Sequence, residues 1–91
     1  MMGQTHELKV WPEYYEALAN GTKTFEYRKN DRGFEVNQLL WLSEWNPKIE
    51  EYTKRSMLFE IQYILYGGKM GIPEGYCIMS LGIPIIVNEG E

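Results

Sequence analysis

The stretch from Gly21 to Arg28, GTKTFEYR, constrains the fold most, because a helix stop leads there directly into an alternating pattern. The preceding Asn20-Gly21 pair is typical of a helix end. Side chains of an extended segment alternate between two faces at intervals of about 3.3 Å. One face then carries Thr24, Glu26 and Arg28, and the other carries Phe25 and Tyr27. The stretch therefore predicts a strand that anchors a core on one face and presents charge on the other.

The surrounding segments predict one helix among several short strands. Residues 5–11 form a first strand, and a helix begins at Pro12. Residues 36–45 are apolar on both faces, as in a covered strand, and a polar connection follows over residues 46–55. After a glycine-rich loop over residues 66–75, residues 76–81 form a strand and residues 83–87 an edge strand. The clearest alternation places on one face Met57, Phe59, Ile61, Tyr63 and Leu65.

Together these elements predict an α+β, mainly β fold. We expect a small barrel of five to six mostly antiparallel strands with one main helix near the N-terminus. A chain of 91 residues has room for one core only. We therefore assign residues 1–91 to a single domain, with a core over about residues 6–81 and a C-terminal extension over residues 82–91.

Charge and cysteine content exclude several classes of protein. A net charge of −4 argues against general attraction to duplex nucleic acid, although a local basic cleft remains compatible with it. Cys77 is the only cysteine, which excludes an internal disulfide and indicates a reducing compartment. Neither a signal peptide nor a membrane-spanning stretch is recognisable. We expect a cytoplasmic protein with no membrane partner.

Charged side chains gather in and just after the GTKTFEYR stretch. Arg28 offers a planar fork of donors for phosphate or base edges, Lys23 a mobile point charge, and Glu26 an acceptor for amino groups. These residue types at a helix-to-strand junction suit a binding cleft. The same pattern also fits a solvated strand face whose charges offset one another.

GTKTFEYR resembles the G-x-K-x-x-E-x-R signature of the ASCH domain, a member of the PUA-like barrel superfamily. The similarity to a small, single-domain bacterial and phage subgroup extends over residues 6–81, through HELKV, RKNDR, YTKR and EGYCIMSL. The chain departs from that subgroup at Asn37-Gln38, where Gly-Asp is usual, and at Lys54, where glycine is usual. Lys54 adds a positive charge near the expected binding site.

The resemblance implies a β-barrel whose cleft binds RNA or a nucleotide-like ligand. Lys23 and Arg28 would contact phosphates or bases, and Glu26 would orient them or accept a hydrogen bond from a base. Other residues would surround the mouth of the cleft or brace it: His6, Asn30, Asp31, Arg32, Tyr52, Thr53 and Arg55. The resemblance implies no cofactor.

Two alternatives remain open. Some ASCH proteins resemble small amidohydrolases that act on acylated cytidine through a threonine, a lysine and a glutamate. Here Lys23 matches the lysine, but Glu26 occupies the position of the threonine, so Thr24 would have to serve as nucleophile. The second alternative is a phage or host protein-interaction module that uses the apolar segment 83–87 as a pairing edge.

Three other residue types fit structural roles. His6 is the only histidine and lacks a His or Cys partner, so no transition-metal site is expected. Cys77 suits a small buried apolar position. Trp41 and Trp45 share one face of a strand, where they could stack on bases, but we expect Trp41 to belong to the core.

Overall fold

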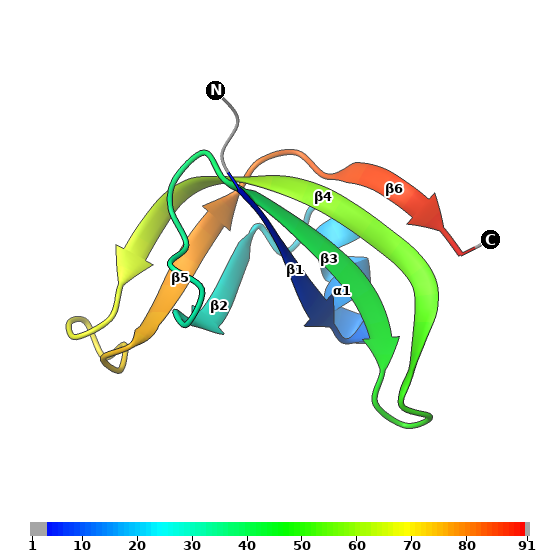
Figure 1. Cartoon of the computed structure of the whole chain (residues 1–91), viewed down its shortest axis with the longest axis horizontal. Helices are drawn as coiled ribbons and strands as arrows, with labels where there is room; N and C mark the ends of the chain where they lie inside the picture. The colour runs from blue at the N-terminus through cyan, green and yellow to red at the C-terminus, as the bar shows by residue number, and fades with distance from the viewer. Residues whose placement is uncertain (1–3, 91) are drawn as a thin grey trace.

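The fold, described for residues 4–90 by a computed structural model, is a six-stranded sheet with one short helix (Figure 1). Residues 1–3 and 91 lie outside this description, so the outer ends of the predicted domain are not covered. In chain order the elements are β1 (Thr5–Val10), α1 (Pro12–Ala19), β2 (Phe25–Lys29), β3 (Leu39–Asn46), β4 (Glu51–Tyr66), β5 (Tyr76–Leu81) and β6 (Ile85–Glu89). The predicted mainly β class with one helix near the N-terminus is confirmed.

The strands follow the order β1-β3-β4-β5-β2, and β6 pairs with β4 beside this path. β1 and β3 are parallel, whereas every other pairing is antiparallel. The 16-residue β4 connects the two halves of the sheet, because its first part pairs with β3 and its last part with β5. Within residues 4–90 the sheet is open, with β1 and β2 as its two ends and no backbone ladder between them.

Apolar side chains from the strands and the helix form one core. Leu40 and Leu42 of β3 and Phe59 of β4 are almost fully buried, and Leu18 of α1 is buried in the same core. The helix starts with Pro12 in its first turn, where the missing amide costs no hydrogen bond. It stops at Asn20 and Gly21, and Gly21 has a φ of +84°, which glycine adopts without steric penalty. Both predicted helix boundaries are confirmed.

Several predicted boundaries are wrong for local reasons. β3 begins at Leu39 and not at residue 36, because Asn37 adopts a positive φ of 76° that interrupts an extended strand. β4 begins at Glu51, inside the segment predicted as a polar connection, because Glu51 pairs with Asn46 and Tyr52 pairs with Trp45 of β3. The last strand covers Ile85–Glu89 instead of residues 83–87. Trp41 is half-buried and does not belong to the core.

The predicted alternation in β4 holds only as far as Ile61. A register shift between Ile61 and Tyr63 leaves Gln62 as an extra residue opposite β5. After it, Ile64 faces the core at 5% exposure, whereas Tyr63 is 64% exposed. Tyr63 and Leu65 therefore lie on the face opposite to the one predicted.

Candidate functional site

Arginine side chains connect the two ends of the sheet. β1 pairs with β3 on one side only, so the carbonyl groups along its other edge have no strand partner. Arg28 of β2 donates through Nη2 to the carbonyl oxygen of Lys9, and Arg32 Nη1 donates to the carbonyl oxygen of Glu7 at 2.8 Å. β1 and β2 are thus held facing one another by side chains, and α1 lies behind β1 and β3 in Figure 1.

Glu26 fixes the two cations of the GTKTFEYR stretch. Its carboxylate is buried in β2, with 3% of the residue exposed. Lys23 Nζ donates to Oε1 at 2.9 Å, and Arg28 Nε donates to Oε2 at 2.8 Å. The backbone amide of Lys23 also donates to the carbonyl oxygen of Ala17, which ties this residue to α1. The pair of ion pairs holds both cations in set positions beside the gap between β1 and β2.

The two faces of β2 are used in the opposite way to the prediction. Glu26 and Arg28 point inward, whereas Phe25 and Tyr27 are 44% and 47% exposed. The inward face of β2 lies opposite the free edge of β1, where unpaired carbonyl groups need donors and a buried carboxylate finds two cations. The aromatic rings are left on the outer side.

A first cavity of about 460 Å³ lies between β1, the start of α1 and β2. Aromatic side chains dominate its rim, and Trp11 and Tyr14 stack with ring centroids 6.3 Å apart. Lys23 Nζ lies 5.3 Å from the ring centroid of Tyr14 and 5.1 Å from that of Phe25. The lining residues are Lys9, Val10, Trp11, Tyr14, Lys23, Phe25, Glu26, Tyr27 and Arg28.

A second cavity of about 540 Å³ adjoins the first, since Lys9 and Arg28 line both. Its other lining residues are Glu7, Leu8, Arg32, Ser43 and Tyr52. Lys9 Nζ lies 4.3 Å from the ring centroid of Trp45 and 5.9 Å from that of Tyr52. We call the two adjoining cavities the cleft.

The cleft is locally basic on an acidic chain. Its lining contains four cationic side chains, from Lys9, Lys23, Arg28 and Arg32, against two carboxylates, from Glu7 and Glu26. The chain as a whole carries a net charge of −4. The cationic side chains also lie next to exposed rings, since Trp11, Tyr14 and Tyr52 are between 44% and 54% exposed. The arrangement therefore suits an anionic ligand that also presents flat apolar groups.

The sequence matches the family described as "Domain of unknown function (DUF3850)" over residues 5–81. The chain belongs to this family. It is also similar to the uncharacterized 12.9 kDa protein in the GpA 3′ region of Escherichia phage P2, with 40% identity over 45 residues. That alignment covers 50% of this chain and 41% of the phage protein.

Of the residues predicted to bind a ligand, five line the cleft of this DUF3850 domain: Lys23, Glu26, Arg28, Arg32 and Tyr52. Three others lie outside its lining. His6 is 3% exposed, its Nε2 lies 2.7 Å from Gln38 Oε1, and its ring meets Phe34 edge-on. The Asn30 side-chain oxygen accepts a hydrogen bond from the Phe34 amide. Asp31 is exposed, and its Oδ1 lies 3.9 Å from Arg32 Nε. His6 and Asn30 thus position the segments that flank the cleft.

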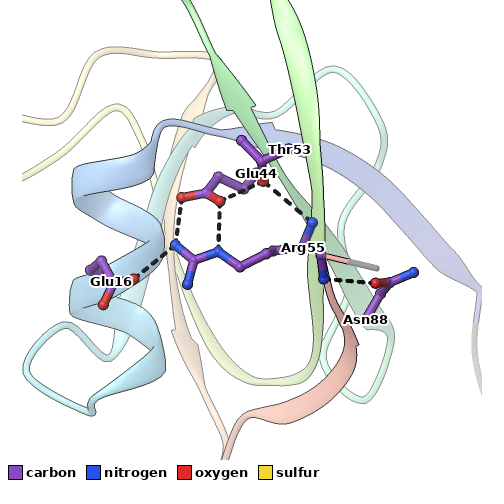
Figure 2. A network of polar contacts seen from close by, with 6 residues as sticks. Glu16, Glu44, Thr53, Arg55 and Asn88 are labelled. Carbon is purple, nitrogen blue, oxygen red and sulfur yellow. Dashed lines mark hydrogen bonds and ion pairs between the residues drawn. The ribbon is translucent and has the colours of Figure 1, made fainter.

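Arg55 lines neither cavity of the cleft and belongs to a network beside α1 (Figure 2). Its Nε and Nη2 donate to the two oxygens of Glu44, each at 2.8 Å, and Nη2 also donates to Glu16 of α1 at 2.8 Å. Thr53 Oγ1 donates to Glu44 at 2.5 Å, and the guanidinium lies 4.5 Å from the ring centroid of Tyr15. The network joins α1, β3 and β4.

Ionisation in this network reflects those contacts. The hydrogen bond from Arg55 holds the pKa of Glu44 below its ordinary value, and the hydrogen bond from Thr53 acts in the same direction. The Glu44 carboxylate in turn raises the pKa of Arg55. Burial raises the pKa of the Tyr15 phenol and that of the Cys77 thiol. Arg55 and Glu44 therefore form an ion pair, charged at neutral pH, that braces the fold.

Of the three residues named for the amidohydrolase alternative, Lys23 and Glu26 line the cleft and Thr24 does not. Thr24 is exposed just before β2 and does not line either cavity. Lys23 donates to Glu26, and the backbone carbonyl of Thr24 accepts a hydrogen bond from Leu81. Among residues 4–90, no group of three or more His, Cys, Asp or Glu side chains could hold a metal ion. No helix within the same range is long and apolar enough to cross a membrane.

Sequence reasoning missed five of the cationic and aromatic lining residues: Lys9, Trp11, Tyr14, Phe25 and Tyr27. Lys9 alternates along β1 with the buried Leu8 and Val10, so the sequence predicts that its side chain points away from the core. Its position opposite Arg28 depends on how the two ends of the sheet meet. Tyr14 precedes the buried Tyr15 and so lies on the outer side of the helix. The exposure of these aromatic residues is the signal that only the fold supplies.

Proposed function

We propose that this chain is an RNA- or nucleotide-binding module of the ASCH type, whose ligand occupies the cleft between β1 and β2. One observation carries the proposal: the cleft combines four cationic side chains with half-exposed aromatic rings on a chain whose net charge is negative. Single-stranded nucleic acid is recognised by this combination of charge along a groove and stacking on rings.

The first cavity offers a place for a base. Trp11, Tyr14, Phe25 and Tyr27 leave 44% to 47% of their surface exposed around it. Stacking of a base on an aromatic side chain contributes about 1–3 kcal/mol and is available to every base. Glu26 lies deeper, with both carboxylate oxygens bonded to Lys23 and Arg28, so it acts on the ligand through these cations.

The second cavity offers a place for a phosphate. Lys9, Arg28 and Arg32 converge on it, and Glu26 and the carbonyl oxygen of Lys9 hold the Arg28 guanidinium. A guanidinium fixed in this way loses little side-chain freedom on binding, which favours affinity. Because Lys9 and Arg28 line both cavities, the base and phosphate of one nucleotide could bind side by side.

Backbone geometry supports the ASCH-type assignment. The ASCH subgroup that the sequence resembles usually has glycine at the positions of Asn37 and Lys54. Both residues have a positive φ here, of 76° and 75°. Glycine adopts this conformation without strain, and asparagine tolerates it better than lysine does. We further propose that the open sheet corresponds to a PUA-like barrel whose last seam, between β1 and β2, is closed by Arg28 and Arg32 in place of a backbone ladder.

The acidic total charge limits the kind of nucleic acid that fits. Long duplexes would be repelled outside the cleft, whereas a short single strand or a nucleotide meets mainly the basic lining. Binding should therefore be local and sensitive to salt. Such ligands are available in the cytoplasm, the location expected for a chain with a single cysteine.

The test is a calorimetric titration of the protein with nucleoside monophosphates and with short single-stranded RNA at low salt, about 50 mM. Arg32→Ala removes a cation from the cleft but no contact to Glu26, and we expect about tenfold weaker binding, as for loss of one charged hydrogen bond. Lys69→Ala is the matched control, because Lys69 is exposed in the β4–β5 loop and does not line the cleft. Absence of binding by the wild type, or equal losses in both variants, would contradict the proposal.

A further inference from the structure

A second aromatic surface covers the outer side of β2, β5 and the end of β4. These strands form the part of the sheet opposite β1 and β3 in Figure 1. Their inward side chains, such as Met79 and Ile64, are buried in the core. The outward ones are exposed or half-buried. We call this surface the aromatic face, and define it by Phe25, Tyr27, Tyr63, Leu65, Tyr76 and Ile78.

Strand register places these residues in rows. Ser80 of β5 lies between Phe25 of β2 and Tyr63 of β4. Ile78 lies in the same way between Tyr27 and Leu65. Neighbouring strands are about 4.8 Å apart, so the backbones of Phe25 and Tyr63 are separated by about 10 Å. The small side chain of Ser80 therefore lies between these two aromatic residues.

The bulge in β4 creates this surface. Without the extra residue Gln62, the alternation that buries Ile61 would also direct Tyr63 into the core. With it, Tyr63 is 64% exposed beside Ser80. Bulges commonly re-aim a side chain near functional sites. The bulge therefore removes a large ring from the core and makes it available at the surface.

The aromatic face is continuous with the cleft. Phe25 and Tyr27 belong to the face and also line the first cavity. Tyr27 stacks on Tyr76, with ring centroids 5.6 Å apart and planes 24° apart. In the β2–β5 pairing, Lys29 is the charged residue on this face, so the surface bears a positive charge. A ligand that leaves the cleft past Phe25 therefore meets rings and a cation.

We propose that the aromatic face stacks the bases of a single-stranded RNA whose first nucleotide occupies the cleft, so that the ligand is an oligonucleotide and not a free nucleotide. This inference rests on the proposed function of the cleft and extends it. Flat rings on a sheet, joined to a cationic groove, are the arrangement that binds successive bases in single-strand-binding proteins. A protein partner would need no continuity with the basic lining, and the exposed aliphatic residues of β6 offer it a better surface.

The test compares a mononucleotide with a single-stranded RNA of about six nucleotides, a length within the range that small binding domains cover. Tyr63→Ala removes a ring that does not line the cleft. We expect it to weaken binding of the oligonucleotide at least about fivefold, the loss of one stacked base, and to leave mononucleotide binding unchanged. Tyr66→Ala is the control, because Tyr66 is 48% exposed but is paired with the inward-facing Cys77. Tyr63→Phe should retain wild-type affinity.

The outcomes separate the two proposals. If the wild type binds the mononucleotide as tightly as the oligonucleotide, or if Tyr63→Ala behaves like Tyr66→Ala, the stacking face is overturned and the cleft stands. If neither ligand binds, both proposals fail. Sedimentation velocity provides a further test: self-association that disappears in Tyr63→Ala would identify the aromatic face as a protein-docking surface and would also overturn the inference.

Discussion

Two buried carboxylates in this domain, Glu26 and Glu44, have the same exposure and different surroundings. Each residue lies on a strand and is 3% exposed. Glu26 accepts a hydrogen bond from Arg28, and Glu44 accepts hydrogen bonds from Arg55. Glu44 meets Arg55 through both of its oxygens, and the same guanidinium reaches a second carboxylate, Glu16. Glu26 divides its oxygens between Lys23 and Arg28.

The two carboxylates differ in whether their arginine partner can also contact a ligand. Arg55 is paired with two carboxylates, those of Glu44 and Glu16, so its charge is neutralised within the fold although its side chain is 34% exposed (Figure 2). Arg28 bridges to a backbone carbonyl across the seam and lines two adjoining cavities. A carboxylate–arginine pair therefore serves as a brace where the partners are all anionic, and as part of a site where it holds a cation at a cleft.

The largest expected effect breaks the brace. Arg55→Met leaves Glu44 buried with only the Thr53 hydroxyl as a partner, and uncompensated buried charges are costly. We expect the free energy of unfolding to fall by about 3 kcal/mol, with ligand affinity unchanged in the fraction that remains folded. Urea denaturation measures the first and calorimetry the second.

Glu16→Ala is the control for this variant, because the Glu16 side chain is 61% exposed and its ion pair is screened by water. Its removal should cost less than about 1 kcal/mol. Equal losses for Glu16→Ala and Arg55→Met would show that the Glu44 pair does not carry the stability of the network.

The second prediction is that a substitution at the cleft affects ligand affinity more than stability. Arg28→Met leaves Glu26 paired with Lys23, so unfolding free energy should fall by only about 1–2 kcal/mol, the value of a charged hydrogen bond. Nucleotide affinity should fall more than about tenfold, because a fixed guanidinium is lost from both cavities. A variant that loses stability like Arg55→Met while keeping its affinity would remove the distinction between the two arginines.

Sequence reasoning reached the local elements and failed where distant segments meet. The strand Tyr76–Leu81 and the helix that starts at Pro12 were predicted with correct bounds, since both have local start and stop signals. The face of Tyr63 was predicted wrongly, because the bulge at Gln62 is fixed by pairing with β5. Lys9 was missed because only the approach of the two sheet ends brings it to Arg28.

The third prediction concerns the contribution of Glu44 to the pH dependence of stability. Its pKa in the folded state lies below the ordinary value, so its ionisation stabilises the fold above about pH 4.5. That contribution should be lost as the pH falls through the lowered pKa. Urea denaturation at a series of pH values below about 5 should show a smaller acid-induced loss of stability in Glu44→Gln than in the wild type. Identical pH dependence in both proteins would contradict the role assigned to Arg55.

The smallest expected effect concerns the backbone conformation of Lys54, the residue before Arg55. Lys54 has a φ of 75° next to Arg55, a conformation that costs a residue with a Cβ about 1 kcal/mol. Lys54→Gly should therefore raise the unfolding free energy by somewhat less than about 1 kcal/mol, given the greater freedom of glycine in the unfolded chain. Lys54→Ala keeps the Cβ and should bring no gain. A gain in both variants would indicate that the charge of Lys54, and not its conformation, is unfavourable.

The most direct test of the ligand cleft is a ¹⁵N–¹H NMR titration of the wild-type protein with a short single-stranded RNA. We predict that amide shifts change along β1, β2 and the start of α1, where Lys9, Lys23 and Arg28 line the cavities. The amides of Glu44 and Arg55 should stay unchanged, because these side chains are paired with one another and line neither cavity of the cleft. Shift changes centred on β6 or on the Glu44–Arg55 network, with β1 and β2 unaffected, would contradict the assignment of the cleft as the binding site.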